Sequence, residues 1–550
     1  MRRPVAPGGR ARSAHVARPR QRDTEKTTAT GGRDRPGPAP SSMPSPPPDV
    51  RRPNRPGSFA AFAVALLGAL ALCACKAPVL RDEVDTVVLL SIDSLRADHV
   101  GAHGYGWPTT PSIDALAARG TVFERAYSTT SWTLPAHVSM LTGLEAETHG
   151  VIDDGRSIPA TILTIAERAK AAGVETAGVY SGPYLQPAYG FGRGFGTYAN
   201  CSGIGADDAG LGLDWGERKG THRKSHEAVT NPCIRARVGA WARSAPRTGK
   251  RFLFVHLWDV HYDYAPPPGY VEIFDPDYRG SADFSKLFVN ESIRAGMPAR
   301  DLRRLIALYD GEIRWTDDTI AGILADLDAA GLLRRSIVVV TADHGEEFLE
   351  HGGKAHRLSL HEEVLRVPMI VARPGGPEIG RRSEEVVSLV DVAPAICSWL
   401  VLDCADLGTA GPLAEAAVPG PARGGGDGRG RDDALAHLKA RRLDDEAFRA
   451  RVGHHAKVVE RPGGGIEFYA APEFPGSDLK PSESFDRAGL SRASAAAADS
   501  VGALDARVAR AQEKGRLLRP VDPAPTAAID DATRDRLESL GYLPRTESSP

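Results

Sequence analysis

Apolar residues in this chain gather in short, unbroken runs, and these runs predict the strands of a sheet. DTVVLLSI at residues 85–92 and RFLFVHLW at residues 251–258 are long enough for a strand and show no polar alternation. Unbroken β-branched and aromatic runs are typical of parallel strands that are buried on both faces. We predict six such strands, at residues 85–92, 121–127, 175–180, 251–258, 336–341 and 367–372.

Segments with helical periodicity separate these runs. One begins at Ser112, a good helix cap, and another is opened by Pro135, which suits the first turn of a helix. Four helices are predicted on this basis, at residues 112–119, 135–142, 159–172 and 312–330. Strands that alternate with helices indicate the α/β class, here a mostly parallel sheet sandwiched by helices.

The chain changes character after residue 402. Residues 403–434 are rich in Gly, Pro and Arg, which predicts a linker or a loosely ordered loop. Residues 435–550 predict a small C-terminal α+β subdomain and tail, with two short strands within 454–471 and helices at 503–514 and 531–540. Residues 84–402 then form the main domain.

The N-terminal segment carries a charge of its own. Its first 55 residues hold 12 arginines and one lysine against four acidic residues, so a leader of +9 precedes a body of −11 within the net charge of −2. Residues 1–58 predict a disordered basic leader, and residues 59–75 a signal segment. Leu72–Cys75 resembles a lipobox with Cys75 as the lipid acceptor. We expect a lipoprotein on the membrane of the bacterial cell envelope, in the periplasm or on the outer surface; a cleaved secretory signal or a plain N-terminal anchor is the alternative.

Composition narrows the class of protein. A hydrophobic share of 42% excludes wholesale disorder, and an acidic body argues against a nucleic-acid partner. Four cysteines follow the leader, an even number that suits an oxidising compartment. The most local pairing joins Cys201 to Cys233 and Cys397 to Cys404, and four buried thiols are the alternative.

Metal-type ligands follow three of the predicted strands. Asp93 comes directly after the first run, Asp259 and His261 follow the run at 251–258, and Asp343 with His344 follows the run at 336–341. Ligands gather at the carboxyl ends of strands in open α/β sheets. Oxygen and imidazole donors that converge there are what a divalent ion needs.

A hydroxyl lies beside a predicted helix N-terminus in SWTLPAHVSMLTG. Pro135 places Thr133 at the start of that helix, where main-chain amides and the helix dipole favour a tetrahedral anion. A metal-bound hydroxyl there would be a nucleophile. The competing interpretation is that Thr133 simply caps the helix.

Six blocks of the chain resemble the successive blocks of the sulfatase family, within the alkaline phosphatase superfamily. They are LSIDSLRADHVGAHGY, SWTLPAHVSMLTG, LWDVHYDYAPP, YDGEIRWTDD, TADHGEEFLEHGG and LHEEVLRVPMIV, and the ending DATRDRLESLGYL is similar to those of bacterial members. The resemblance implies an alkaline-phosphatase-like fold. It also implies a divalent metal (Ca, Zn or Mn) and a sulfate or phosphate ester substrate, which is a small molecule, glycan or lipid.

The resemblance assigns roles to individual residues. Asp93, Asp343 and His344 match metal ligands, and Thr133 takes the nucleophile position. The remaining matches are His137 in place of the usual arginine, His261 as the active-site histidine, and Lys354 and His356 in the loop of the basic sulfate contact. His261 and His356, with Asp259 as a third candidate, form a possible second metal site.

Besides Thr133 itself, two positions depart from the family pattern. Ser94 stands where the family has a second metal-binding Asp, and Val179–Ser181 replaces its Lys-x-His motif. Thr133 cannot form the formylglycine of sulfatases, because oxidation of threonine yields a ketone. We therefore expect a metal-dependent hydrolase or transferase that prefers phosphoesters. A sulfatase with a non-formylglycine route and an inactive anchored binding protein are the alternatives.

Overall fold

Eight strands form one sheet with β1 (Thr86–Ile92) among its central strands. β1 pairs in parallel with β5 (Arg251–Leu257) on one side and with β6 (Ser336–Ala342) on the other. All residues of these three strands are buried, which explains the unbroken apolar runs. The strand order is β10-β2-β9-β6-β1-β5-β3-β4, with β2 at Gly120–Tyr127, β3 at Glu175–Tyr180, β4 at Thr197–Asn200, β9 at Met369–Ala372 and β10 at Arg381–Ser388.

The strand directions agree with the predicted class. β9 is antiparallel to β2 and β6, whereas every other pair in this sheet is parallel. β10 was not predicted, because its first five residues (RRSEE) are polar. It lies at the edge of the sheet, where that half of the strand is not fully buried.

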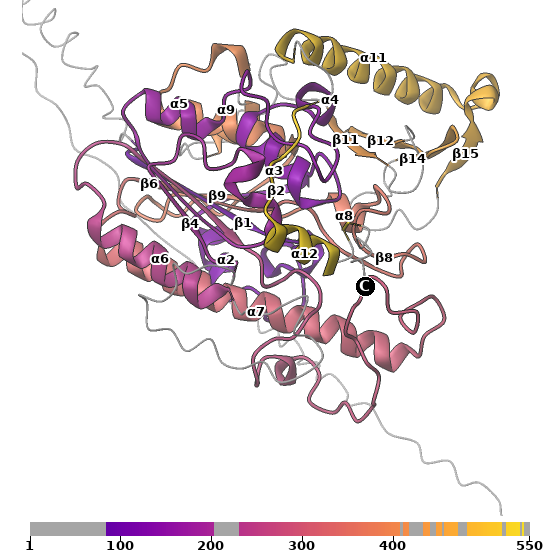
Figure 1. Cartoon of the computed structure of the whole chain (residues 1–550). Helices are drawn as coiled ribbons and strands as arrows, with labels where there is room; N and C mark the ends of the chain where they lie inside the picture. Colours follow the sequence, from indigo (N-terminus) through magenta and orange to yellow (C-terminus); the bar gives the residue numbers. More distant parts are fainter. Residues whose placement is uncertain are drawn as a thin grey trace, which may run out of the picture. The chain divides into compact units, whose positions relative to one another are not determined.

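Helices cover both faces of the sheet, as Figure 1 shows. One face carries α3 (Thr133–Thr142), α5 (Ile165–Ala171) and α9 (Val392–Leu400). The other carries α2 (Pro111–Ala118), α6 (Asn231–Ser244) and α7 (Ala299–Ala329). The α/β class with a mostly parallel, helix-sandwiched sheet is therefore confirmed.

All four helices predicted in the main domain start at other residues; α3 begins at Thr133 rather than residue 135. α2 begins at Pro111, and Ser112 is not its cap; the Asp317 carboxylate instead accepts bonds from the first turn. α5 begins at Ile165 rather than residue 159, because Thr164 forms a capping box there. α7 begins at Ala299 rather than residue 312, since its first turns carry many charged residues and hide the apolar period.

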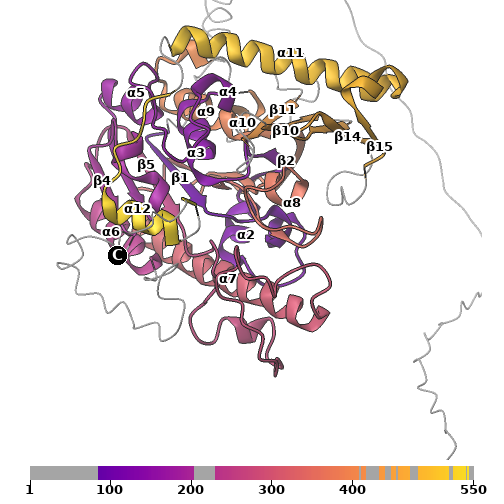
Figure 2. The same ribbon diagram turned by 45° about the vertical axis from the view of Figure 1, so that its right-hand side comes forward.

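A second, antiparallel sheet lies in the C-terminal part, and Figure 2 shows α11 beside it. Its apolar side and α11 share one cluster that includes Leu435, Val458, Ile466 and Leu504. Its strands in order are β11 (Asp433–Lys439), β12 (Ala447–Gly453), β13 (Ala456–Glu460), β14 (Gly465–Ala470) and β15 (Glu483–Asp486), and the long helix is α11 (Ala495–Leu518).

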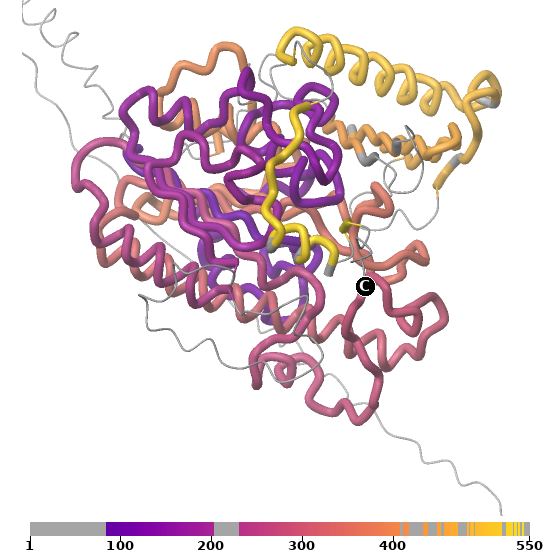
Figure 3. The backbone as a smooth tube through the Cα atoms, viewed as in Figure 1, coloured from indigo at the N-terminus to yellow at the C-terminus, as the bar shows by residue number. Residues whose placement is uncertain are grey.

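The last described helix, α12 (Asp531–Ser539), returns to the main sheet. Figure 3 shows the yellow C-terminal segment running over the purple segment of the first 200 residues. Main-chain hydrogen bonds join the two, from Ser157 N to Pro525 O (2.8 Å) and from Ala527 N to Gly155 O (2.7 Å). The short elements α4 (Ala146–His149), β7 (Glu347–Phe348), β8 (Lys354–Ala355), α8 (Glu362–Leu365) and α10 (Gly411–Glu415) complete the helices and strands described here.

This computed structural model describes residues 84–202, 230–407, 411–416, 433–439, 447–453, 456–470, 481–519, 524–539 and 542–543. The predicted leader, the signal segment with Cys75 and much of the predicted linker lie outside these residues. Within them, no helix is both long and apolar enough to cross a membrane. Both cysteine pairs form disulfides, Cys201 with Cys233 and Cys397 with Cys404, which confirms the local pairing.

Candidate active site

The carboxyl ends of β1 and β6 bring three predicted metal ligands together. Asp93 follows β1, and Asp343 and His344 follow β6, so the parallel pairing of the two strands makes them neighbours. His344 Nε2 lies 3.4 Å from Asp343 Oδ2 and 3.8 Å from Asp93 Oδ1. All three side chains are fully buried. The structure thus brings the three side chains together, as the parallel strands predicted; their role as metal ligands stays a prediction.

Thr133 is the first residue of α3 and faces this cluster. Its Oγ1 lies 3.4 Å from Asp93 Oδ2 and 3.4 Å from His344 Nε2. The residue at the cap position is Trp132, so the hydroxyl of Thr133 does not occupy the capping position that the competing interpretation required. The Thr133 hydroxyl thus lies at a helix N-terminus beside a carboxylate and a histidine, a position that also favours anions.

Two histidines beside the carboxylates belong to a regular helix and strand. We call these residues, His137 and His256, the inner pair. His137 comes from α3 and His256 from β5, and their ring centres are 4.7 Å apart. His137 contacts Ser91 Oγ at 2.9 Å and the main-chain oxygen of Thr133 at 2.9 Å. The predicted supporting residue of the nucleophile therefore contacts its backbone rather than its hydroxyl.

Two further histidines come from loops, and we call His261 and His356 the outer pair. Their ring centres are 5.0 Å apart, and the ring of His356 is 4.3 Å from that of His344. His356 Nδ1 contacts Glu346 Oε1 at 3.0 Å. The structure thus brings together the two residues predicted for a second metal site.

Besides the contact of His137 Nδ1 with Thr133 O, main-chain carbonyls fix the tautomers of three more of these rings. Nδ1 of His256 contacts Ser181 O at 2.7 Å, that of His344 contacts Gly345 O at 2.8 Å, and that of His261 contacts Tyr262 O at 2.6 Å. Because a carbonyl only accepts, each Nδ1 carries a proton and each neutral ring presents a lone pair on Nε2. Metal-binding histidines are held in this way.

The carboxylates also fit a cation. Burial opposes ionisation of Asp93, but the nearby His256, His261 and His344 outweigh it and lower its pKa. Burial and the charge of Asp93 raise the pKa of Asp343. Asp343 Oδ2 is buried and has no hydrogen-bond partner among the described residues. Two carboxylates that share a buried space repel each other, and a divalent ion between them and His344 removes that repulsion.

A buried arginine supplies positive charge that the sequence analysis did not identify. Arg357 forms a bidentate ion pair with Asp154 at 2.8 and 3.0 Å, and its guanidinium lies 3.9 Å from the ring centre of Trp132. Its charge helps to lower the pKa of His344, after the larger effect of burial. This arginine therefore stands beside the residue that precedes Thr133 and within electrostatic reach of the metal ligands.

Lys354 and Asp259 are engaged elsewhere. The ammonium of Lys354 donates to the main-chain oxygen of Asn290, and burial lowers its pKa. The carboxylate of Asp259 accepts bonds from the backbone of Thr230 and from Trp315 Nε1. Asp259 therefore holds the start of α6 against α7, which does not support a place in a second metal site.

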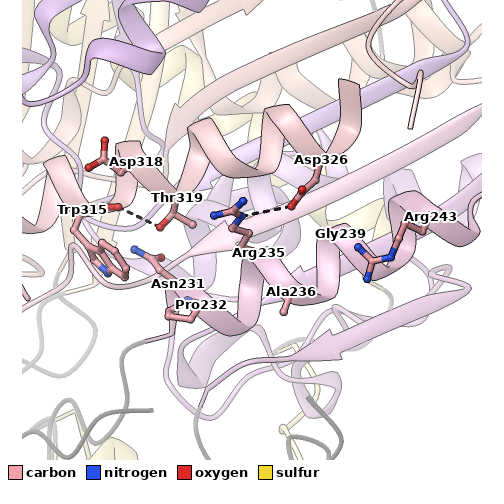
Figure 4. Close-up of a pocket in the computed structure, with 10 residues that line it drawn as sticks. All are labelled: Asn231, Pro232, Arg235, Ala236, Gly239, Arg243, Trp315, Asp318, Thr319 and Asp326. Carbon is pink, nitrogen blue, oxygen red and sulfur yellow. Dashed lines mark hydrogen bonds and ion pairs between the residues drawn. The ribbon is translucent and has the colours of Figure 1, made fainter. Parts of the chain in front are cut away.

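A cavity of about 590 Å³ lies between α6 and α7, and Figure 4 shows its lining. Trp315, the partner of Asp259, is at one end, and Arg235 pairs with Asp326 across it at 3.5 Å. None of the residues that line it belongs to the cluster around Asp93. This cavity is therefore distinct from the candidate site.

Both departures from the expected pattern have a structural counterpart. Ser94 adopts a left-handed conformation (φ 56°), and its hydroxyl donates to Asp93 Oδ1 at 2.7 Å. Ser94 therefore orients the carboxylate of Asp93, whereas a second Asp at its position would have been a further metal ligand. At the end of β3, where the Lys-x-His motif was expected, the carbonyl of Ser181 holds His256.

Three residues near the site were not predicted from the sequence: His256, Arg357 and Tyr542, whose hydroxyl contacts Nε2 of His261 and of His356. His256 had a readable signal, because it is a polar residue inside an otherwise apolar strand run. Arg357 sits beside His356 but in a loop without a regular pattern. Tyr542 comes from the far end of the chain, and only the family-like ending pointed toward it.

Comparisons with known proteins identify the family and the fold. Residues 85–402, more than half of the chain, match the family model described as Sulfatase. An arylsulfatase of Clostridium perfringens is 23% identical over 372 residues, covering 58% of this chain and 76% of the relative. An ulvan-active sulfatase of Formosa agariphila is 25% identical over 354 residues, covering 60% and 66%. The crystal structure of a phosphonate monoester hydrolase of Agrobacterium radiobacter shares the fold, with a TM-score of 0.60 at 18% identity, covering 78% of this chain and 96% of that one.

Proposed function

The chain belongs to the sulfatase family of hydrolases, and from this premise we propose that it is a metal-dependent phosphoester or phosphonate ester hydrolase with Thr133 as its nucleophile. The observation that carries the proposal is the position of Thr133 Oγ1, 3.4 Å from both Asp93 and His344 at the start of α3. A covalent route through threonine needs a displaceable phosphoryl group, because the formylglycine route of sulfate esters is closed to this residue.

Asp93, Asp343 and His344 would hold one divalent ion (Ca, Zn or Mn). We assign no second ion to the outer pair, because Nε2 of His261 and Nε2 of His356 both face the hydroxyl of Tyr542. When bound, such an ion supplies Lewis acidity to the Thr133 hydroxyl and to the non-bridging ester oxygens. The chain itself orients the hydroxyl through α3. The amides at the helix N-terminus and the Arg357 charge favour the anionic substrate.

A second candidate function is sulfate ester hydrolysis by a route without formylglycine. The names of the two relatives, an arylsulfatase and an ulvan-active sulfatase, support it. In either case the substrate is an anionic ester of a small molecule, glycan or lipid.

A panel of esters separates the two candidates. The metal-free protein is loaded with Zn, Mn or Ca and offered an aryl sulfate, a phosphate monoester, a phosphodiester and a phosphonate monoester. We expect turnover of a phosphorus ester to exceed that of the sulfate. Turnover of the sulfate alone would establish the second candidate, and no turnover with a full metal content would favour an inactive binding protein.

Two substitutions test the nucleophile. Thr133→Ala should reduce kcat by roughly a thousandfold or more, as is usual for the loss of a nucleophile, whereas Thr133→Ser should retain part of it. The matched control is Thr142→Ala, at the other end of α3, where the hydroxyl bonds only the helix carbonyl of Val138. Unchanged turnover in Thr133→Ala would sink the assignment.

We also propose that the protein is exported and anchored through Cys75. The basic leader, the apolar segment and the lipobox-like Leu72–Cys75 support this, as do two disulfides in the exported part. Mass spectrometry of the mature N-terminus from cells would show a lipid-modified Cys75; an unmodified N-terminus would contradict the anchor.

A further inference from the structure

The C-terminal tail reaches the candidate active site. Leu537 of α12 is fully buried, and Thr533 Oγ1 bonds Gln186 Oε1 at 2.8 Å, so the helix is fixed on the segment that follows β3. Beyond the helix, the amide of Tyr542 bonds the oxygen of Leu537 at 2.7 Å. The tail therefore delivers Tyr542 in a defined position.

Tyr542 lies between the two histidines of the outer pair. Its hydroxyl is 2.5 Å from His261 Nε2 and 3.2 Å from His356 Nε2. The side chain is 3% exposed, which excludes bulk water as the competing partner. Among the described residues, His256 and His137 of the inner pair bond Ser91, Thr133 and Ser181 rather than the tail.

A hydroxyl is suited to this place because it both donates and accepts. His261 uses Nδ1–H for the Tyr262 carbonyl, so its Nε2 accepts the phenolic proton. His356 is held at its Nδ1 by Glu346, and its Nε2 meets the same phenolic oxygen. Each ring is thus fixed at both nitrogens, and the phenol is the shared contact.

The ring of Tyr542 has a separate role from its hydroxyl. Its centre lies 5.2 Å from that of Tyr184, and the guanidinium of Arg357 lies 5.0 Å from it. Together with Trp132, these side chains form a wall of aromatic groups around the arginine. A phenylalanine would preserve this wall and remove only the bridge between the histidines.

We propose that Tyr542 is a positioning residue of the active site, whose hydroxyl holds His261 and His356 in the orientation that the reaction uses. The site is then complete only with the C-terminal tail seated. This inference rests on the proposed ester hydrolysis and adds a residue to it from outside the region that matches the family.

Kinetics of Tyr542→Phe and Tyr542→Ala separate the two roles. Phe should lower kcat about 10- to 100-fold, the usual range for a partner that orients a ligand, and leave KM within about twofold. Ala should lower kcat similarly and also raise KM, because the wall beside Arg357 is lost. The matched control is Tyr469→Phe, which removes a buried hydroxyl that bonds Glu467 in the C-terminal sheet.

Chemical modification tests the placement without any turnover. Diethyl pyrocarbonate modifies accessible imidazoles, and mass spectrometry of the peptides reports each histidine. We expect His261 and His356 to be protected in the wild-type protein and in Tyr469→Phe. In Tyr542→Ala both should be modified several-fold faster, while His437 in the C-terminal sheet keeps its rate.

The two experiments distinguish the possible failures. Equal modification rates in Tyr542→Ala and wild type would overturn the seated tail, whatever the protein's activity. Protection combined with full kcat in Tyr542→Phe would reduce Tyr542 to packing, and a higher kcat would make it an obstruction; both overturn the proposal. A wild-type protein inactive on every ester, with protection intact, would contradict the proposed function and not the placement.

Discussion

The inner and outer histidine pairs flank the same acidic cluster but are built in different ways. His137 and His256 lie within α3 and β5, and their contacts are Ser91 and main-chain oxygens. His261 and His356 lie in loops, and besides the carbonyl of Tyr262 their hydrogen-bond partners are the side chains of Glu346 and Tyr542. The inner side therefore exists as soon as the sheet forms, whereas the outer side needs the tail. Rigid elements position groups more accurately than loops do, so we expect the inner side to set the metal and the outer side to set the substrate.

The largest effect should come from Asp343, which can join Asp93 and His344 in one candidate metal group and His137 and His256 in another. Asp343→Asn should abolish stoichiometric metal binding and lower kcat/KM by roughly a thousandfold or more, because a neutral amide no longer balances the ion. Elemental analysis and kinetics measure this, with Asp326→Asn in the α6–α7 cavity as the control. A full metal content in Asp343→Asn would show that Asp343 is not the metal ligand that both sides of the site share.

The next effect concerns the inner pair. His256→Gln should weaken metal affinity about 10- to 100-fold, since His256 Nε2 faces Asp93 Oδ2 at 3.4 Å and is otherwise without a hydrogen bond. Titration with Zn or Mn by calorimetry measures it. His103→Gln, a buried histidine beside Glu124, is the matched control. Equal affinities in the three proteins would show that the inner side does not set the metal.

Arg357→Lys probes the outer side. Lysine cannot reproduce the bidentate pair with Asp154, so the charge should move away from Trp132. We expect KM to rise about tenfold, equivalent to ~1.4 kcal/mol, with metal affinity unchanged. Arg314→Lys, whose ion pair with Asp318 is partly exposed, serves as the control. A changed metal affinity would contradict the view that the outer side acts on the substrate and not on the metal.

The smallest effect on activity should come from the disulfides. Removing Cys201–Cys233 by serine should lower the free energy of unfolding by about 3.5 kcal/mol, and removing Cys397–Cys404 by about 2.5 kcal/mol, because the longer loop gains more entropy when it is opened. Denaturant titration measures both. The first bridge ties the end of β4 to α6, so only its loss should also affect kcat. A larger loss of stability or of kcat on removal of Cys397–Cys404 would contradict this view.

The sequence predicted the sheet and the acidic cluster because both follow from local rules. An unbroken apolar run identifies β1, β5 and β6, and their shared direction puts Asp93, Asp343 and His344 at one edge. The predicted helix starts were wrong where a residue distant in the sequence binds the first turn of the helix, as Asp317 does at α2. The polar edge strand β10 was missed because periodicity reports burial and little of that strand's first half is buried.

The outer side of the site was predicted only in part, for a physical reason. His261 and His356 came from the family pattern, but Arg357 and Tyr542 act through contacts with residues that are 203 and 281 positions away. Such contacts depend on how the loops and the tail pack, and no periodicity in the sequence records that. Lys354 shows the converse, because its position in the pattern suggested an anion contact and its ammonium bonds Asn290 instead.

The place of β1 in the sheet has a consequence for how the protein folds. Thr86 pairs with Arg251 and with Ser336, so β1 cannot pair until strands that lie 165 and 250 residues further along the chain have been synthesised. Pairing over such distances is slow, because closing the long loop costs conformational entropy before any stabilising contact forms. Until then the run TVVLLSI is an exposed, uncharged and strand-forming segment, which is the kind that aggregates. The nascent chain should therefore depend on a chaperone that shields its first strand, and recombinant yield should respond to chaperone supply more than to any residue of the active site.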